Sequence, residues 1–423
     1  MTDKNRLPAR DEALHPAPGR GIAYYKVLII FLFFFSCILV LNHAGGHVVA
    51  GAVGLGAFFG ILGKPIPHPK SWPASIWAGL IFVAYFAISN LWSNDIDPGP
   101  YSNVIKFAVG TPVSALIIWV MVLQPRILKT LWRKWLGYGV LVSVIVFSFD
   151  ILSGFALTKA VDPGAAPENI DANISHGISV IMVIMWPALF MISHDNKHAG
   201  TFRSAVMIAA GVLMAFAIFR FSNFASIIAI GAASISVLCA LKWPKFVINV
   251  LFAALTLSLI FSPWLGFAAS KLSETQKAAL PFSWEWRVET WGFIWTEILD
   301  SPLIGHGFGA LRGYDDTFSA RGFDALSIIP THAHNAGLHL WVEGGGFGIL
   351  ITVIALWFIR RSVVTAKWLS PQRAIAIAGG LAAIIVYANI SYSVWQDWWI
   401  GTIALFAAMI PLIPELRAKK NAP

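Results

Sequence analysis

The chain contains little charge and little cysteine for its 423 residues, and both shortages narrow its class. Only 12% of the residues are charged, whereas 57% are hydrophobic and the mean hydropathy is +0.71. A typical soluble domain carries about 25% charged residues. The two cysteines, Cys37 and Cys239, fall in apolar runs, so the sequence offers no disulfide framework. We therefore expect an all-α polytopic membrane protein.

Several motifs of soluble enzymes are also missing. The sequence has no glycine-rich nucleotide cradle and no D-x-D pair in an outer loop, which argues against nucleotide-sugar or ATP chemistry. No cysteine or carboxylate cluster at ligand spacing accompanies the histidines, so we expect no metal and no cofactor. No internal repeat supports an inverted-repeat transporter. No cleavable signal is evident, so the first apolar run is expected to be retained.

Apolar runs of spanning length fill most of the chain. A membrane-crossing helix needs about 20 apolar residues, and about twelve such runs can be drawn. They lie at 24–41, 47–63, 74–92, 104–123, 136–156, 176–193, 205–219, 224–241, 246–264, 338–359, 374–392 and 397–414. The expected order is a tail at 1–23, spans one to nine within 24–264, a large loop at 265–337, spans ten to twelve within 338–414, and a tail at 415–423.

Basic residues indicate the orientation of these spans. Lys and Arg are enriched in cytoplasmic loops, and 22 of the 30 basic residues lie on one side of the twelve-span arrangement. They are Lys4, Arg6, Arg10, Arg20, Lys26, Lys64, Lys70, Arg126, Lys129, Arg133, Lys134, Lys197, Arg203, Lys242, Lys245, Arg360, Arg361, Lys367, Arg373, Arg417, Lys419 and Lys420. The net charge of +9 is thus explained by topology and not by nucleic acid. Both termini are expected in the cytoplasm, and the large loop on the opposite face.

The large loop carries a stripe of tryptophans. Trp284, Trp286, Trp291 and Trp295 have spacings that place most of them on one face of a helix from about Ser283 to Leu299. Such a stripe suits an amphipathic helix on the outer membrane surface. An interfacial tryptophan belt and direct substrate contact are equally good interpretations of it.

Three outward-side arginines are candidates for binding an anion. Arg287 lies between two acidic residues, Glu285 and Glu289, and its guanidinium either binds phosphate or forms a local ion pair. Arg220 ends the seventh span, where it either snorkels or meets a headgroup. Arg312 follows the glycine-rich turn GHGFG, whose N–H groups could also bind phosphate oxygens.

The segment PTHAHNAGLHLWVEGGGFGIL, from Pro330 to Leu350, places polar chemistry at a membrane boundary. In an extended segment His332 and His334 project from the same face. A neutral imidazole in a water-facing pocket can accept a proton from a hydroxyl. The H-x-H spacing also permits zinc, which is the minor alternative because no further ligand accompanies it.

The motifs WRVETWGFIWTEILDSPLIGHGFGALR and HAHNAGLHLWVEGGGFGIL resemble the O-antigen ligase and polymerase superfamily from Ser283 to Leu350. The resemblance implies a GT-C type fold and inverting, metal-independent transfer of a glycan from undecaprenyl pyrophosphate on the periplasmic face. It implies that His334 is the catalytic histidine and that Arg287 binds pyrophosphate. Arg220 lies near the family's other arginine, although this chain reads Ser222-Asn223 where many members have Ser-Arg.

Ligation of O-antigen to a sugar of lipid A-core is the first expected function. Polymerisation of repeat units is the second, and a transporter of lipid-linked glycans is a distant third. His334 and Arg287 are the expected catalytic residues, and Arg220, Arg312, His332 and Asn335 are expected to contact the pyrophosphate or the acceptor. The expected partners are the lipid-linked donor, lipid A-core and membrane lipids, with a monomer in the bacterial inner membrane.

Overall fold

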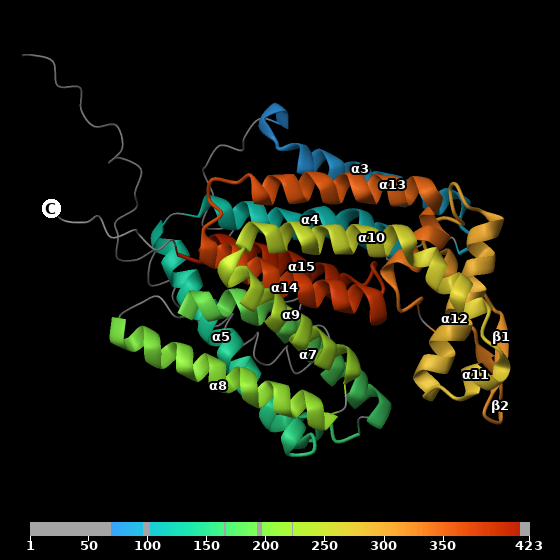
Figure 1. Cartoon of the computed structure of the whole chain (residues 1–423), viewed down its shortest axis with the longest axis horizontal. Helices are drawn as coiled ribbons and strands as arrows, with labels where there is room; N and C mark the ends of the chain where they lie inside the picture. The colour runs from blue at the N-terminus through green and yellow to red at the C-terminus, as the bar shows by residue number, and fades with distance from the viewer. Residues whose placement is uncertain are drawn as a thin grey trace, which may run out of the picture.

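The computed structural model describes residues 69–95, 102–124, 126–164, 166–192, 197–221, 223–330 and 332–414. Long helices dominate these ranges and form one elongated bundle (Figure 1). The bundle helices are α3 (Ala74–Ser89), α4 (Asn103–Leu123), α5 (Arg126–Leu152), α7 (Pro167–Ile192), α8 (Lys197–Phe221), α9 (Phe224–Lys242), α10 (Pro244–Ser270), α13 (Ala336–Val364), α14 (Pro371–Ile390) and α15 (Asp397–Met409). Short helices are η1 (Pro69–Ser71), η2 (Asn90–Trp92), α6 (Ala156–Val161) and η4 (Ile410–Leu412).

Eight helices in the described ranges are long and apolar enough to cross a membrane: α3 with η2, α4, α5, α7, α9, α10, α13 and α14. The helices expected at 205–219 and 397–414 form, but their apolar parts are shorter, at Gly211–Phe221 and Asp397–Leu412. The runs expected at 24–41 and 47–63 lie outside the described residues. The fold is therefore that of a mostly helical, polytopic membrane protein. The total of twelve spans and the GT-C type stay predictions.

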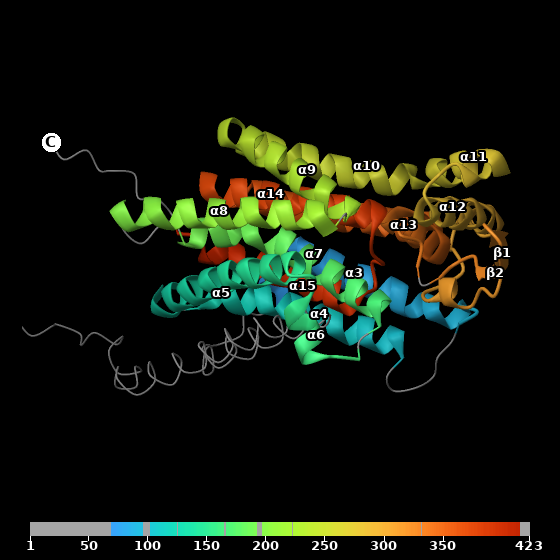
Figure 2. The ribbon, with the colours of Figure 1, turned by 90° about the horizontal axis from the view of Figure 1, so that it is seen from below.

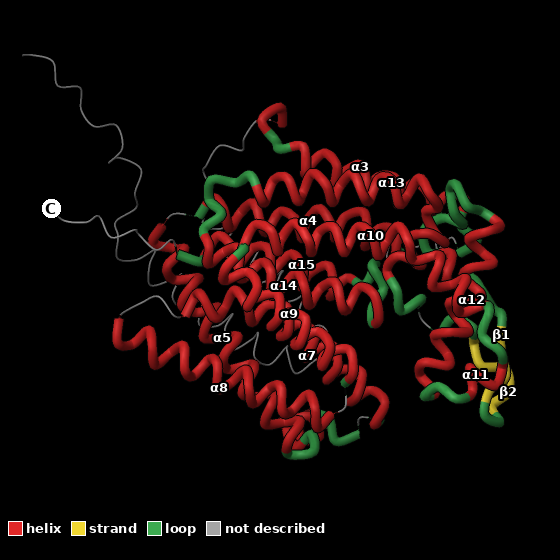
Figure 3. Tube along the Cα trace, in the orientation of Figure 1, coloured by secondary structure: helices red, strands yellow, loops and turns green. Residues whose placement is uncertain are grey.

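The chain between α10 and α13 forms a separate unit at one end of the bundle, which we call the loop domain (residues 271–335; Figures 1 and 2). It contains α11 (Glu274–Ala278), α12 (Phe282–Asp300), η3 (Ala310–Arg312), β1 (Thr317–Ala320) and β2 (Phe323–Ser327). The two strands pair antiparallel and are the only ones in the described part of the chain (Figure 3). The loop is shorter than expected because α10 continues to Ser270 and α13 begins at Ala336.

The helix expected from Ser283 to Leu299 is α12, and its tryptophans hold the loop domain together. The indole N–H of Trp291 donates to the carbonyl of Ala333 at 2.8 Å, and that of Trp286 donates to the carbonyl of Ser327 at 2.9 Å. A buried indole needs such an acceptor. These two tryptophans therefore fix the segment that leads into α13.

The helix α13 is broken near its start, and the loop domain fills the break. Gly345 has φ 59° and ψ −165°, which interrupts the helical hydrogen bonds. The N–H groups of Gly346 and Phe347 instead donate to the carbonyls of Pro302 and Leu303 at 2.8 and 3.0 Å. In return, the carbonyls of Val342 and Glu343 accept from the N–H groups of His306 and Gly307 at 2.8 and 2.9 Å. The GHGFG turn and the GGG run are thus two halves of one backbone junction, which satisfies polar groups that hydrocarbon would leave unpaired.

We expect Gly345→Ala to destabilise the protein, because a Cβ at this positive φ would lie 2.4 Å from the carbonyl carbon of Leu303. Backbone strain of this kind costs about 1–3 kcal/mol before the clash is counted. Thermal unfolding in detergent, followed by tryptophan fluorescence, measures the effect. The matched control is Gly79→Ala in α3, where a Cβ meets no atom within 4 Å and stability should be kept or raised. Equal unfolding temperatures for the two variants would contradict the proposal that the backbone junction at Gly345 stabilises the protein.

Candidate active site

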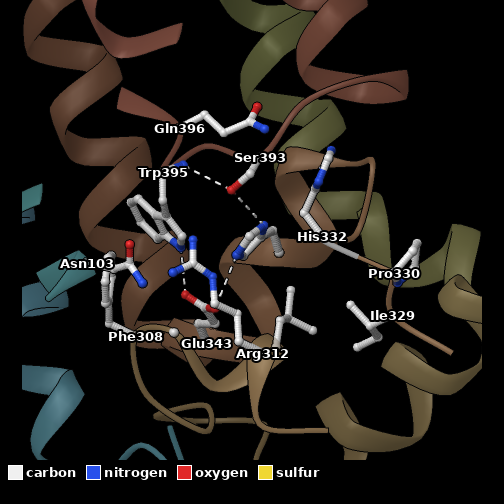
Figure 4. Close-up of a pocket in the computed structure, with 13 residues that line it drawn as sticks. Asn103, Phe308, Arg312, Ile329, Pro330, His332, Glu343, Ser393, Trp395 and Gln396 are labelled. Carbon is white, nitrogen blue, oxygen red and sulfur yellow. Dashed lines mark hydrogen bonds and ion pairs between the residues drawn. The ribbon is translucent and has the colours of Figure 1, made fainter. Parts of the chain in front are cut away.

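A cavity of about 390 Å³ lies where the loop domain meets the bundle (Figure 4). Sites for small molecules usually enclose about 300–1,000 Å³. Its walls come from the loop domain, the first turns of α13 and the connection between α14 and α15, which we call the 391–396 turn. The lining residues are Asn103, Phe308, Gly309, Leu311, Arg312, Ile329, Pro330, His332, His339, Glu343, Ser393, Trp395 and Gln396.

The 391–396 turn brings the two predicted histidines together. The carbonyl oxygen of Ser391 lies 2.8 Å from Nε2 of His332 and 2.7 Å from Nδ1 of His334, and the ring centroids are 4.2 Å apart. A carbonyl oxygen only accepts, so each of these ring nitrogens carries the proton. In the neutral imidazole of His334 the lone pair is then on Nε2. This geometry gives His334 a nitrogen that can accept a proton.

Both imidazoles are held in the uncharged form. Burial, together with the positive charge of Arg287, lowers the pKa of His334 from 6.5 to about 4. Burial and the neighbouring His334 lower the pKa of His332 to about 3. Desolvation disfavours a charged imidazole, so at neutral pH His334 is able to act as a base.

The backbone of His334 is strained, and its neighbour fixes it. His334 has φ 52°, a left-handed conformation that costs energy for a residue with a side chain. Asn335 follows as the N-cap of α13: its Oδ1 accepts from the N–H of Leu338 at 2.9 Å, and its Nδ2 donates to the carbonyl of Asn389 at 3.1 Å. Asn335 is buried and orients His334. Substrate contact by Asn335 stays a prediction.

Arg287 in α12 presents a partly buried positive charge beside the histidines. Its Nη1 donates to the carbonyl of Ser283 at 2.7 Å, and the guanidinium lies over the ring of Trp284, 5.4 Å from the centroid. Its Nε is buried and has no hydrogen-bond partner among the described residues. Burial lowers the pKa of Arg287, although a guanidinium stays protonated.

The local ion pair considered for Arg287 is wrong, because both neighbouring carboxylates have other partners. Glu285 accepts from Nε of Arg321 at 2.7 Å, and Glu289 accepts from Nζ of Lys277 at 3.0 Å. Arg321 reaches Glu285 from the turn of the hairpin between β1 and β2. The guanidinium of Arg287 is therefore left to interact with another anion.

The other two arginines differ in their relation to the cavity. Arg312 lies in η3, is exposed and lines the cavity, but the preceding turn does not offer its N–H groups to phosphate. The N–H groups of His306 and Gly307 are used in the junction, and that of Phe308 donates to Oγ of Ser89 at 3.0 Å. Arg220 is exposed in the last turn of α8 and does not line the cavity.

The position of the family's Ser-Arg pair has a structural use in this chain. Asn223 is the N-cap of α9: its Oδ1 accepts from the N–H of Ser226 at 3.0 Å. Its Nδ2 donates to Oγ of Ser175 in α7 at 3.1 Å. Replacement of the family arginine by Arg220 stays a prediction.

Sequence reasoning missed a polar centre that lines the cavity, whereas of the predicted catalytic pair neither His334 nor Arg287 is a lining residue. His339 and Glu343 lie one turn apart on α13, and Nε2 of His339 is 3.1 Å from Oε1 of Glu343. Nε1 of Trp395 donates to Oε2 of Glu343 at 2.6 Å, and Oγ of Ser393 lies 3.5 Å from Nδ1 of His339 (Figure 4). The available signal was a carboxylate four residues after a histidine inside an otherwise apolar run.

Comparison with known proteins finds a family model that matches part of this chain. Residues 203–353 match the family model described as O-antigen ligase. The resemblance to the O-antigen ligase family is confirmed. This O-antigen ligase match includes both histidines, the three arginines, His339 and Glu343, whereas the 391–396 turn lies outside it. No group of three or more His, Cys, Asp or Glu in the described ranges could hold a metal ion.

Similar proteins come from the genus Rickettsia, and each is named "Putative polysaccharide ligase". The one from Rickettsia conorii is 23% identical over 275 residues, which is 64% of either chain. The one from Rickettsia typhi is 22% identical over 333 residues, 76% of either chain. The one from Rickettsia felis is 24% identical over 271 residues, 62% of this chain and 63% of the relative. The chain thus spans less than two thirds of the length of two of these relatives.

Proposed function

We propose that this protein transfers a glycan from an undecaprenyl-pyrophosphate carrier to a sugar hydroxyl of lipid A-core, as an inverting glycosyltransferase of the O-antigen ligase type. One observation carries the proposal. A partly buried guanidinium without an acidic partner in the described part of the chain lies close enough to two neutral imidazoles to lower the pKa of both. An anion-binding group beside a proton acceptor is what displacement of a pyrophosphate by a hydroxyl requires.

The reaction follows from these groups. The acceptor hydroxyl donates its proton to Nε2 of His334, and its oxygen attacks the anomeric carbon of the donor sugar. The bond from that carbon to the pyrophosphate oxygen breaks, and the pyrophosphate leaves with the electron pair. Arg287 stabilises the charge that develops on this leaving group. Direct displacement inverts the configuration at the anomeric carbon.

The orientation proposal also has support in the bundle. The starts of α5 and α10 and the end of α13 lie at the end opposite the loop domain (Figure 1). These ends carry basic residues such as Arg126, Lys245 and Arg361. Because basic residues favour the cytoplasmic face, we propose that the loop domain and the cavity face the periplasm of a bacterial inner membrane.

A polymerase, which would use a second lipid-linked repeat unit as acceptor, is not favoured, because the matching family model and the relatives are described as ligases. A transporter would place charges midway along spans, whereas the candidate groups lie in the loop domain and at the start of α13.

Reconstitution tests the function directly. The purified protein in lipid nanodiscs receives a short glycan on polyprenyl pyrophosphate together with lipid A-core, in excess chelator, and mass spectrometry identifies the products. We expect one glycan on lipid A-core, with release of polyprenyl pyrophosphate. Growth of the glycan on its carrier would indicate a polymerase. Absence of transfer, or transfer that requires a specific metal, would contradict the mechanism.

The low pKa of His334 predicts the acid limb of the pH profile. The free enzyme needs a neutral His334, so kcat/KM should be constant from about pH 5 upward and fall as the pH drops through about 4. The charge of Arg287 contributes to this low pKa. In Arg287→Gln, the kcat/KM that remains should therefore begin to fall at a higher pH than in the wild type. A limb near pH 6.5 in the wild type, or no upward movement in the variant, would contradict this role for His334.

A further inference from the structure

The reaction proposed above does not use the polar centre of His339 and Glu343. Burial of these two polar side chains in a membrane-spanning helix costs free energy. The side chains of His339 and Glu343 are only 5% and 1% exposed, and both belong to a helix apolar enough to cross a membrane. A carboxylate in such a place needs hydrogen bonds and is usually functional. Glu343 accepts one from Trp395, and its other oxygen lies 3.1 Å from Nε2 of His339.

The partners of Glu343 are rigid and define one tautomer of His339. Trp395 packs against Phe86, Phe107 and Phe308 with ring centroids 4.8–5.0 Å away, so its indole N–H is fixed toward Glu343. An indole N–H only donates, which makes Oε2 an acceptor. If Oε1 also accepts, His339 carries its proton on Nε2 and presents the lone pair of Nδ1 to the cavity.

Nδ1 of His339 makes only a weak contact within the protein, with the hydroxyl of Ser393. The hydroxyl of Ser393 lies 3.5 Å away, at the limit of a hydrogen bond, and the same Oγ accepts from the N–H of Trp395 at 3.1 Å. The imidazole of His339 therefore lies between the carboxylate of Glu343 and the hydroxyl of Ser393, and all three residues line the cavity. A hydroxyl of a bound molecule would meet the same nitrogen that Ser393 now faces.

The rest of the cavity suits a sugar. Arg312 supplies guanidinium donors, Asn103 and Gln396 supply amides, and Phe308 supplies an apolar wall. The amide Oε1 of Gln396 is buried and has no hydrogen-bond partner among the described residues. Fixed amide and guanidinium groups around an apolar surface are what a polyhydroxylated ring needs, because each hydroxyl both donates and accepts.

We propose that this cavity binds the acceptor sugar and that Nδ1 of His339, oriented by Glu343, accepts a hydrogen bond from one of its hydroxyls. The proposal rests on the function proposed above and adds the acceptor subsite to it. The 391–396 turn links the two centres, because Ser391 holds His332 and His334 while Ser393 faces His339. The acceptor sugar bound by His339 would thus present its attacking hydroxyl to His334.

Two substitutions of His339 separate acceptor binding from a structural role. His339→Gln places an amide near the position of Nε2 and keeps a donor to Glu343, but it removes Nδ1. His339→Asn places an amide near Nδ1 and loses the contact with Glu343. We expect His339→Gln to raise the KM for lipid A-core about tenfold or more, the size of one hydrogen bond lost in a water-excluded site, and His339→Asn to raise it less. The KM for the lipid-linked donor should stay within about twofold in both.

Release of free glycan from the donor in the absence of acceptor is the second readout, and it should be unchanged in both variants. Thr352→Val, which removes a buried hydroxyl bonded only to Gly348 within α13, is the control for the helix. Three results would overturn the acceptor subsite. They are an unchanged KM for the acceptor in His339→Gln, a larger rise of that KM in His339→Asn than in His339→Gln, and an equal loss of transfer and of glycan release. If the wild type neither transfers nor releases the glycan, the proposed function fails as well.

Discussion

His334→Ala should lose about 10²- to 10⁴-fold in the rate of glycan transfer, which is the usual contribution of a positioned general base. The variant keeps Arg287 and the cavity, so it should insert normally and bind the lipid-linked donor. The loss should therefore appear in kcat and leave the KM for the donor nearly unchanged. Alanine keeps the Cβ and so does not relieve the strain at φ 52°, but the N-cap Asn335 is kept, so the start of α13 should be retained.

The variant His332→Ala is the matched control for His334→Ala. Both imidazoles contact the carbonyl of Ser391, so both variants lose this contact, although His332 is buried and His334 is only partly buried. Only one imidazole is needed as the base, and we expect the milder loss for His332. The measurement is single-turnover transfer with purified protein at saturating donor. Near-normal turnover in His334→Ala, or a larger loss in His332→Ala, would remove His334 from its proposed role.

Arg287→Lys should lose about 10²-fold in transfer although the charge is kept. An ammonium is a single point donor, and it does not reproduce the planar guanidinium that can bind two oxygens of a pyrophosphate at once. Removal of one well-placed donor to a developing negative charge typically costs about 10²–10³-fold in kcat. Steady-state transfer and donor binding to nanodiscs together measure the loss.

The loop domain contains a matched control for this substitution. Arg321 pairs with Glu285 at a side chain that is 40% exposed, and it lies over the ring of Phe282. Arg321 does not line the cavity, so Arg321→Lys should leave transfer unchanged, although stability should fall because the buried carboxylate of Glu285 and the carbonyls of Ala278 and Leu280 lose their guanidinium donor. Full turnover in Arg287→Lys, or an equal loss in both variants, would show that Arg287 has no special part in the reaction.

The sequence was sufficient for features that depend on local pattern. The period of the tryptophans predicted α12, and the H-x-H spacing predicted that His332 and His334 project from the same face; their rings do lie together, with centroids 4.2 Å apart. The first prediction succeeds because side-chain direction in a helix follows from spacing alone, whereas the second assumed an extended segment and His334 instead has φ 52°.

Features that depend on contacts across the chain were not accessible in this way. Glu343 appeared as one residue of an apolar span, because its partner Trp395 is 52 residues away. The glycine-rich turn seemed able to bind phosphate, because the sequence does not show that the N–H groups of His306 and Gly307 donate to α13 and that of Phe308 donates to Ser89. Arg287 looked equally suited to a neighbouring glutamate, and only the positions of Arg321 and Lys277 exclude that pairing.

The backbone junction at Gly345 restricts how substrates reach the cavity. Lifting the loop domain away from α13 would break four main-chain hydrogen bonds, made by Gly346, Phe347, His306 and Gly307. Each would leave an unpaired polar group beside the lipid, at a cost of several kcal/mol. The loop domain is therefore a fixed wall of the reaction chamber and not a hinged lid. If the protein acts as proposed, a lipid-linked donor would have to reach the cavity without displacement of the loop domain.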